Sequence, residues 1–338
     1  MREAMLWRPL SGGSVQCRLC SHFCLVRDGE RGRCGVRENR GGALYTLVDE
    51  QVAALNMDPV EKKPLYHFHP GSRTLSFGTM GCNMACAWCQ NASLSQPPRR
   101  GAPIEGHRLR PEQIVAMALE HGAESISYTY SEPTIFFELM RETADLAVRQ
   151  GLKNILVSNG FMSPECLDAL GPLIHAANID LKGFTEDTYR DYCDARLAPI
   201  LDNLRHIRRF GWWLEVTSLL IPELNDSDAE ITKMAEFIAA ELGPDTPWHL
   251  SRFHPDHRLT DRGPTPTQTL TRARDIGREQ GLRFVYIGNA QIAGCGDTCC
   301  PKCGEVLLSR HGFHADGAAV KDGTCSGCGE PVPGVGLP

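Results

Sequence analysis

The sequence predicts an α/β protein whose centre is a partial, TIM-like parallel (β/α)6 barrel, with small cysteine-rich metal-binding segments before and after it. Three observations lead to this fold class. Short β-rich runs alternate with amphipathic helical stretches from residue 73 to residue 287. The loops that follow these runs are rich in Gly, Asn, Asp and His, as functional loops often are. Most of the 15 cysteines fall into three groups.

The β-rich runs are expected to form one parallel sheet, because helices of ordinary length separate them and such βαβ units are right-handed. The predicted strands are Thr74–Phe77, Ser125–Tyr128, Asn154–Val157, Asn178–Leu181, Trp213–Leu219, Trp248–Phe253 and Arg283–Tyr286. The predicted helices lie at 111–121, 134–150, 164–171, 199–210, 228–241 and 267–280.

Three helix starts can be predicted from their capping residues. Ser227, followed three residues later by Glu230, indicates a capping box just before an apolar run. Ser163 and Thr265 each precede a proline, which predicts a cap residue followed by proline at the first helical position.

The 338 residues are expected to divide into a cysteine-rich segment 1–65, the barrel 66–290 and a zinc-ribbon-like segment 291–338. A net charge of −6 argues against a general nucleic-acid or membrane-surface binder, which would present a basic face. No apolar stretch is long enough to span a bilayer, and the first residues lack the order of a signal peptide. A cytoplasmic location is therefore expected, where clustered cysteines more often bind metal than form disulfides.

Cys82, Cys86 and Cys89 lie on the loop after the first predicted strand, at the end of the barrel where active sites form. Three thiolates can bind three irons of a 4Fe-4S cluster and leave the fourth iron open for a cofactor or substrate. The alternatives are a zinc knuckle without its fourth ligand, or three free thiols. Both fit poorly with a loop at a barrel mouth.

Two further groups of cysteines flank the barrel. Near the C-terminus, two C-x2-C pairs predict a structural four-thiolate zinc site, with a second cluster as the alternative, at Cys300, Cys303, Cys325 and Cys328. Near the N-terminus, four more thiols predict structural zinc, with an auxiliary iron–sulfur cluster as the alternative, at Cys17, Cys20, Cys24 and Cys34. His22 is an alternative ligand, although a surface position is favoured. The roles of Cys193, Cys295 and Cys299 stay open.

The barrel lumen is expected to receive side chains from alternate strand positions. These residues are Tyr128, Tyr130, Asn159, Glu215, His249 and Ser251. Such a mixed polar and aromatic lining suits a small polar or peptidic substrate better than a lipid.

The motif CxxxCxxC, with the aromatic Trp88 before its last cysteine, resembles that of the radical S-adenosylmethionine (radical SAM) superfamily. The resemblance implies that S-adenosyl-L-methionine chelates the open iron. Its one-electron cleavage would then give a 5′-deoxyadenosyl radical that abstracts hydrogen from a substrate. Trp88 would pack against the adenine. The enzyme would be an oxygen-sensitive oxidoreductase that works anaerobically.

The loops after the later strands resemble the glycyl-radical-activase branch, to which the pyruvate formate-lyase activating enzyme belongs. Tyr-Ser-Glu-Pro replaces the Gly-Gly-Glu-Pro of that branch, so the turn before Pro133 departs from its pattern. Lys182 is expected near the carboxylate of the cofactor. The residues that the resemblance places around the cofactor are Trp88, Ser131, Glu132, Asn159, Asp180, Lys182 and His254.

The whole chain looks similar to the AmmeMemoRadiSam radical SAM subfamily. Motifs on either side of the barrel carry this resemblance, such as Phe-His-Pro-Gly from Phe68 and Tyr-Ile-Gly-Asn from Tyr286. It implies Memo-like and AMMECR-like partner proteins and an electron donor such as flavodoxin or ferredoxin. The substrate is not implied. The alternatives are a glycyl-radical activase that acts on a protein, and a non-catalytic zinc-binding scaffold.

Overall fold

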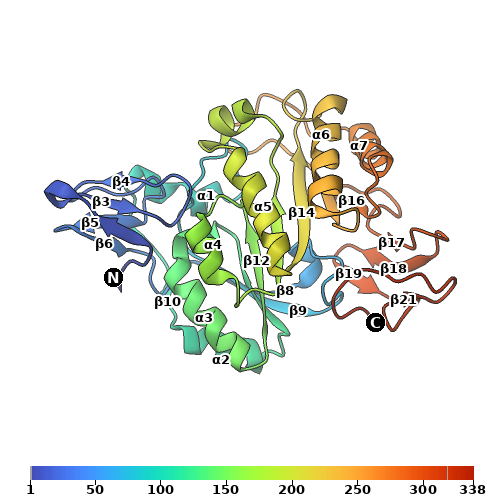
Figure 1. Ribbon diagram of the computed structural model, residues 1–338, viewed down its shortest axis with the longest axis horizontal. Coiled ribbons are helices and arrows are strands. Elements are labelled where there is room, and N and C mark those ends of the chain that lie inside the picture. The colour runs from blue at the N-terminus through green and yellow to red at the C-terminus, as the bar shows by residue number, and fades with distance from the viewer. Residues whose placement is uncertain (1, 318) are drawn as a thin grey trace.

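The computed structural model describes residues 2–317 and 319–338 (Figure 1). Its centre is an eight-stranded sheet in the order β16-β15-β14-β13-β12-β11-β9-β8. Seven of these strands are parallel, and β8 pairs with β9 in the antiparallel direction. The strands are β8 (Ala54–Pro59), β9 (Arg73–Gly78), β11 (Ser125–Tyr128), β12 (Lys153–Ser158), β13 (Ala176–Asp180), β14 (Trp213–Leu220), β15 (Trp248–Arg252) and β16 (Val285–Gly288).

Each of the first six parallel strands is followed by a helix, so the predicted (β/α)6 barrel is confirmed, with β16 as a further strand. The helices are α2 (Pro111–Glu120), α3 (Phe137–Arg149), α4 (Pro164–Leu170), α5 (Ala198–Phe210), α6 (Asp228–Phe237) and α7 (Thr267–Glu279). Shorter helical segments are α1 (Ala92–Ser95), η1 (Ser11–Gly13), η2 (Val60–Lys62), η3 (Pro97–Arg100), η4 (Pro133–Phe136), η5 (Thr188–Cys193) and η6 (Ile238–Leu242).

The predicted helix starts are confirmed in part. The Ser163 hydroxyl accepts a hydrogen bond from the N–H of Cys166, as an N-cap should. Ser227 caps α6, but the expected capping box is wrong, because the Glu230 carboxylate accepts from the Phe184 N–H instead. Thr265 is not a cap, because α7 begins at Thr267 and the Thr265 hydroxyl donates to the carbonyl of Leu220.

Small antiparallel sheets form the N-terminal segment, on the left of Figure 1. Their apolar side chains, such as Val15, Leu19 and Val36, pack into the same core as the barrel. The strands are β1 (Arg2–Glu3), β2 (Trp7–Pro9), β3 (Val15–Cys17), β4 (Leu25–Val26), β5 (Arg37–Arg40), β6 (Ala43–Thr46) and β7 (Gln51–Val52), the last paired with β10 (His107–Arg108). The boundaries at 65 and 290 stay a prediction, and β8 joins the central sheet from inside the first segment.

The C-terminal segment is a small β-ribbon on the right of Figure 1. It has its own apolar cluster, which includes Leu307, Leu308 and Val332. Its strands are β17 (Thr298–Cys299), β18 (Val306–His311), β19 (His314–Asp316), β20 (Val320–Lys321) and β21 (Thr324–Cys325). The ribbon attaches to the segment between β8 and β9, where the N–H of Val335 donates to the carbonyl of His67 at 2.8 Å.

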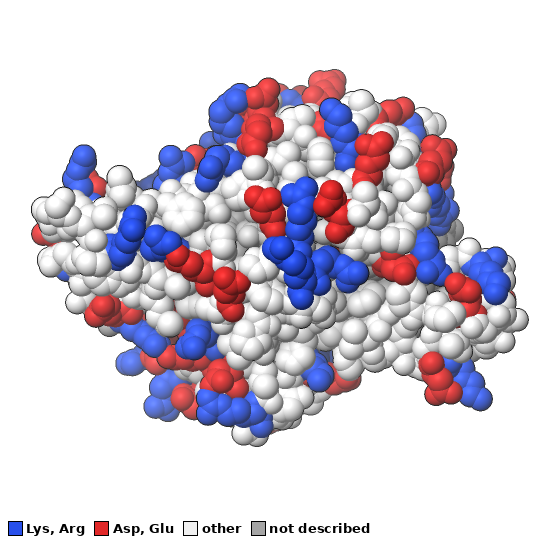
Figure 2. Space-filling model, viewed as in Figure 1, with Lys and Arg blue, Asp and Glu red and all other residues white. Residues whose placement is uncertain are grey.

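Two features of the surface bear on function. On the face shown in Figure 2, acidic and basic side chains are interspersed and no single sign covers the surface. Within residues 2–317 and 319–338, no helix is long and apolar enough to cross a membrane.

The sheet does not close into a complete ring, because β8 and β16 are its two ends.

Candidate functional site

A cavity of about 1640 Å³ lies at the carboxyl ends of the parallel strands. Its lining contains all ten residues that the sequence predicts for the cluster and its cofactor: Cys82, Cys86, Trp88, Cys89, Ser131, Glu132, Asn159, Asp180, Lys182 and His254. Because carboxyl ends of parallel strands meet at one edge of a sheet, loops that are far apart in sequence gather there. The structure thus brings these residues together, while their individual roles towards a cofactor stay predictions.

Hydrogen-bond donors surround the three thiols of the cysteine loop, residues 82–89. The Met84 N–H donates to the Cys82 sulfur at 3.3 Å, and the Ser95 hydroxyl lies 3.2 Å from the Cys89 sulfur. A hydrogen bond from Cys193, together with the nearby Lys182 charge, lowers the pKa of Cys86 to about 7. Burial raises the pKa of Cys89. Donors of this kind stabilise thiolates, the form that binds metal.

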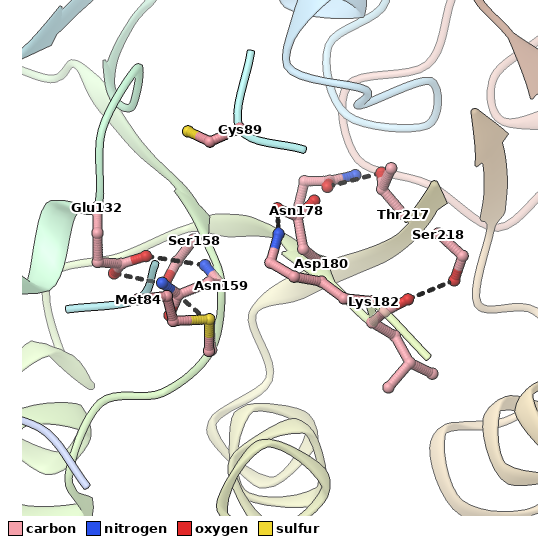
Figure 3. A network of polar contacts seen from close by, with 12 residues as sticks. Met84, Cys89, Glu132, Ser158, Asn159, Asn178, Asp180, Lys182, Thr217 and Ser218 are labelled. Atoms are coloured by element: carbon pink, nitrogen blue, oxygen red, sulfur yellow. Dashed lines mark hydrogen bonds and ion pairs between the residues drawn. The ribbon is translucent and has the colours of Figure 1, made fainter. Parts of the chain in front are cut away.

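The Glu132 carboxylate connects two neighbouring strand ends, as Figure 3 shows. One oxygen accepts from the N–H of Thr134 at 3.1 Å and from the hydroxyl of Ser158 at 2.8 Å. The other oxygen accepts from the N–H of Asn159 at 2.9 Å. Burial raises the pKa of Glu132, although these donors favour its charged form. Glu132 therefore fixes the shape of the cavity floor and has little capacity left for a ligand.

Lys182 and Asp180 also line the cavity and form an ion pair to the right of Glu132 in Figure 3, with 2.7 Å between Nζ and the carboxylate. Burial alone would lower the pKa of Lys182, but Asp180 and the sulfurs of Cys86 and Cys193 outweigh it and raise that pKa. The lysine is thus a partly buried cation close to the cysteine loop. Beside it, the Thr217 hydroxyl donates to the amide oxygen of Asn178 at 2.8 Å.

Comparison with known proteins identifies the family. The model of the radical SAM superfamily matches residues 77–235, which include the cysteine loop and the strand ends described above. Residues 77–235 therefore form a radical SAM domain. Members of this superfamily are enzymes, and the fold implies S-adenosylmethionine and an iron–sulfur cluster. The AmmeMemoRadiSam subfamily is not established by these comparisons.

One relative matches nearly the whole chain, and others match part of it. An uncharacterized protein of Methanocaldococcus jannaschii is 41% identical over 98% of this chain and 99% of its own length. The 7-carboxy-7-deazaguanine synthase of Thermococcus kodakarensis is 26% identical over 42% of this chain and 61% of its own. The crystal structure of Streptococcus suis SuiB bound to S-adenosylmethionine covers 64% of this chain and 52% of its own, with 13% identity and a TM-score of 0.51. The last likeness shows the shared fold.

The cavity offers polar groups that fit the cofactor of a radical SAM enzyme. The Ser131 hydroxyl lines the cavity and is buried without a hydrogen-bond partner in the described part of the chain. Buried polar groups usually have partners, so unused ones in a cavity indicate a missing ligand. Trp88 is buried and stands beside Tyr192, with 6.3 Å between ring centres, whereas His254 is exposed at the cavity.

The C-terminal cysteines form a compact four-thiol group, as predicted. The sulfurs of Cys300, Cys303, Cys325 and Cys328 lie within 4.8 Å of one another, and two of the pairs are 3.6 Å apart. Four thiolates about 2.3 Å from a tetrahedral zinc would be about 3.8 Å apart, so this group has the spacing of a zinc site. Cys295 and Cys299 are not part of the group.

The N-terminal cysteines also come together, but less closely. Burial and the neighbouring sulfurs of Cys17, Cys24 and Cys34 raise the pKa of Cys20 well above its ordinary value. No three of these sulfurs fall within 4.8 Å of one another in the described chain. Wider spacing suits a cluster in which each thiolate binds a different iron.

The N-terminal group lies against the cysteine loop. The expected surface position of His22 is wrong, because its Nε2 lies 2.7 Å from the carbonyl of Asn83, next to Cys82. Gly81, next to Cys82, also lies close to the N-terminal group, because a Cβ atom placed on Gly81 would be 3.3 Å from the carbonyl oxygen of Cys34.

Two of the predicted lumen residues do not line the cavity. Tyr128 is fully buried and its hydroxyl donates to Asn154 at 2.9 Å. Glu215 is also buried, behind the lining. Burial alone would raise the pKa of Glu215, but the hydrogen bond from His249 helps to lower it. Tyr130, Asn159, His249 and Ser251 do line the cavity.

Sequence reasoning missed the side chains that reach the cavity from outside the parallel strands and the loops that follow them. Tyr66 comes from the segment between β8 and β9, and Arg310 comes from β18 of the ribbon. The sequence contains no local signal for either, because both positions depend on how the ribbon docks on the barrel.

Proposed function

We propose that Cys82, Cys86 and Cys89 hold a 4Fe-4S cluster whose electron cleaves S-adenosylmethionine, so that a 5′-deoxyadenosyl radical removes hydrogen from a substrate in the same cavity. The observation that carries this proposal is the shared cavity. It joins three thiols, a partly buried cation at Lys182 and the unused hydroxyl of Ser131.

The chain's own residues would position the cofactor. Lys182 would bind its carboxylate, because a charge-assisted hydrogen bond is roughly twice as strong as a neutral one. Ser131 would accept a hydrogen bond from its ammonium group, and Trp88 would pack against its adenine. Glu132, which follows β11, would hold the end of β12 in place beneath these groups through its bonds to Ser158 and Asn159.

The flanking cysteines are proposed to hold two different metals. The spacing of the C-terminal thiols favours zinc, and the wider N-terminal group favours an auxiliary iron–sulfur cluster over zinc. An electron donor such as flavodoxin or ferredoxin, Memo-like and AMMECR-like partners, and a reducing cytoplasm belong to the same proposal. The activase and scaffold alternatives are decided by experiment.

Anaerobic reconstitution of the full chain with iron, sulfide and zinc tests the proposal. If the cysteine loop and the N-terminal cysteines each hold a four-iron cluster, we expect about eight irons and one zinc per chain. We also expect 5′-deoxyadenosine when dithionite and S-adenosylmethionine are added. About four irons would restrict the cluster to the cysteine loop. No deoxyadenosine from cluster-loaded protein would refute the proposed chemistry and favour the scaffold.

Alanine variants of the cysteine loop make the test specific. Cys82→Ala, Cys86→Ala and Cys89→Ala should each lose deoxyadenosine formation and the iron of that cluster, because three ligands are the minimum for a site with one open iron. Zinc should remain in all three. Cys166→Ala is the matched control, since Cys166 is a buried thiol on α4 outside the cysteine groups. Full turnover in a loop variant would show that its cysteine is not a ligand.

A further inference from the structure

Arg310 of the C-terminal ribbon is a buried cation at the cavity. It is 8% exposed and lines the same cavity as the cysteine loop. Its Nη1 donates to the carbonyl of Gly296 at 3.0 Å and to the hydroxyl of Thr298 at 2.7 Å. Its Nη2 donates to the carbonyl of Tyr66 at 2.6 Å. All three acceptors are neutral, so they orient the guanidinium without balancing its charge.

The guanidinium has hydrogen-bonding capacity left. Its Nε is buried with no acceptor within the described chain, and Nη2 uses one of its two N–H donors. Donors on two adjacent nitrogens are what arginine uses to bind a carboxylate or phosphate through two parallel bonds.

No carboxylate of the described residues pairs with Arg310. The Asp297 carboxylate accepts from the backbone N–H of Arg310 at 2.7 Å, not from its side chain. Burial raises the pKa of Glu61, and the nearby Arg310 charge counteracts this rise. One Glu61 oxygen accepts from the N–H of Gly71 at 2.7 Å and the other is buried without a hydrogen-bond partner in the described chain, so Glu61 lies near Arg310 but does not bond to it. A buried charge is costly unless an opposite charge accompanies it, so the site is suited to an anion from outside.

The surroundings of Arg310 form a chamber within the cavity. The guanidinium lies over the ring of Tyr66, at 4.1 Å from its centre. The ring of His249 meets Tyr66 edge-on at 4.7 Å. His249 is held by the buried carboxylate of Glu215, 2.6 Å from its Nε2, and it also lines the cavity. None of these residues belongs to the set predicted to bind the cofactor.

We propose that this chamber is the substrate subsite and that Arg310 binds an oxyanion of the substrate, a carboxylate or a phosphate. The substrate is then a small acidic molecule or an acidic group of a larger one. This inference rests on the proposed function, because the bound molecule is a substrate only if the radical forms in this cavity. It assigns the chemical class of the molecule on which the radical would act.

Isothermal titration calorimetry on the cluster-loaded, zinc-loaded full chain tests the subsite. Saturating S-adenosylmethionine is included so that its own carboxylate fills the cofactor site. Inorganic phosphate and acetate are the probes, and chloride at equal ionic strength is the reference. The two probes distinguish the two sources of the oxyanion.

Three variants define the expected result. Arg310→Met should weaken binding of the preferred oxyanion at least tenfold, and Arg310→Lys should bind with intermediate affinity, because lysine keeps the charge without the fork. Arg283→Met is the matched control. Arg283 also joins barrel to ribbon, through Asp245 at 2.8 Å and Glu330 at 3.1 Å, and it does not line the cavity. We expect Arg283→Met to bind phosphate and acetate with the affinities of the wild type.

The zinc content and thermal midpoint of each variant show whether the ribbon is folded. If Arg310→Met does not fold, Arg310→Lys decides, and an unchanged Kd in that variant would overturn the proposal. So would wild-type affinity in folded Arg310→Met, or no preference of the wild type for either oxyanion over chloride. Calorimetry does not require cofactor cleavage, so these failures are separate from an absence of deoxyadenosine in the wild type, which would refute the proposed function.

Discussion

Glu215 is expected to be one of the most sensitive positions in the barrel. Its buried carboxylate accepts from the N–H groups of Tyr66 and His67 at 2.9 and 2.8 Å, and from the indole N–H of Trp213 at 2.9 Å. Its second oxygen is 2.6 Å from Nε2 of His249. Glu215→Ala removes every one of these acceptors while the donors stay inside the protein.

The cost can be worked out from the donors left behind. Each buried donor without an acceptor costs about 1–3 kcal/mol, so the two backbone amides alone predict a loss of about 2–6 kcal/mol. Glu215→Gln keeps the first oxygen and its three hydrogen bonds. The new amide group can donate to Nε2 of His249 in the other tautomer, so we expect a loss below about 1.5 kcal/mol.

Urea unfolding of the metal-loaded chain, followed by tryptophan fluorescence, measures both variants against the wild type. An alanine variant within about 1 kcal/mol of the wild type would show that water or a shifted backbone replaces the carboxylate. A glutamine variant as unstable as the alanine variant would show that charge, not hydrogen bonding, is what the site needs.

Three other outcomes are expected. Lys182→Ala and His254→Ala should keep their iron but bind S-adenosylmethionine more weakly in an electron paramagnetic resonance titration. For Lys182 the loss should be about tenfold or more, since hydrogen bonds to charged groups contribute about 1.5–3 kcal/mol; wild-type curves would leave both residues structural. Cys300→Ser should release zinc, measured by mass spectrometry, and make the ribbon sensitive to protease; retained zinc would contradict the four-thiolate site. Burial alone would raise the pKa of Asp58, but hydrogen bonds from Lys63 and other donors lower it below 3.8. The stability that Asp58 contributes is therefore present above its unfolded pKa and is lost as the pH falls through the folded value. Asp58→Asn should reduce acid sensitivity below about pH 4, and an unchanged profile of thermal midpoint against pH would refute the pairing.

Local patterns predict most of the barrel because they depend on neighbours in the sequence. Alternation of strands and helices gives the parallel sheet, and the rule that parallel strands end at one edge gathers the loops of Ser131, Asn159 and Lys182. Ser163 caps its helix because capping needs only the next three residues.

Features that depend on distant contacts are not visible in the same way. Glu230 fits the capping-box pattern, yet its carboxylate binds the N–H of Phe184, which the sequence places 46 residues away. Glu215 alternates like a lumen residue but binds the backbone of the segment after β8. Arg310 belongs to a ribbon that looks separate in sequence, and only its docking brings the guanidinium to the cavity.

The order in which the ribosome makes the chain has a consequence for the cavity. Its walls combine a segment made before the first parallel strand, around Tyr66, with one made after the last parallel strand, around Arg310. Domains can begin to fold during synthesis, so the parallel sheet can form while the ribbon has not yet been translated. A nascent barrel would then expose its cysteine loop with the chamber still open. Translation and docking of the ribbon therefore complete the chamber last.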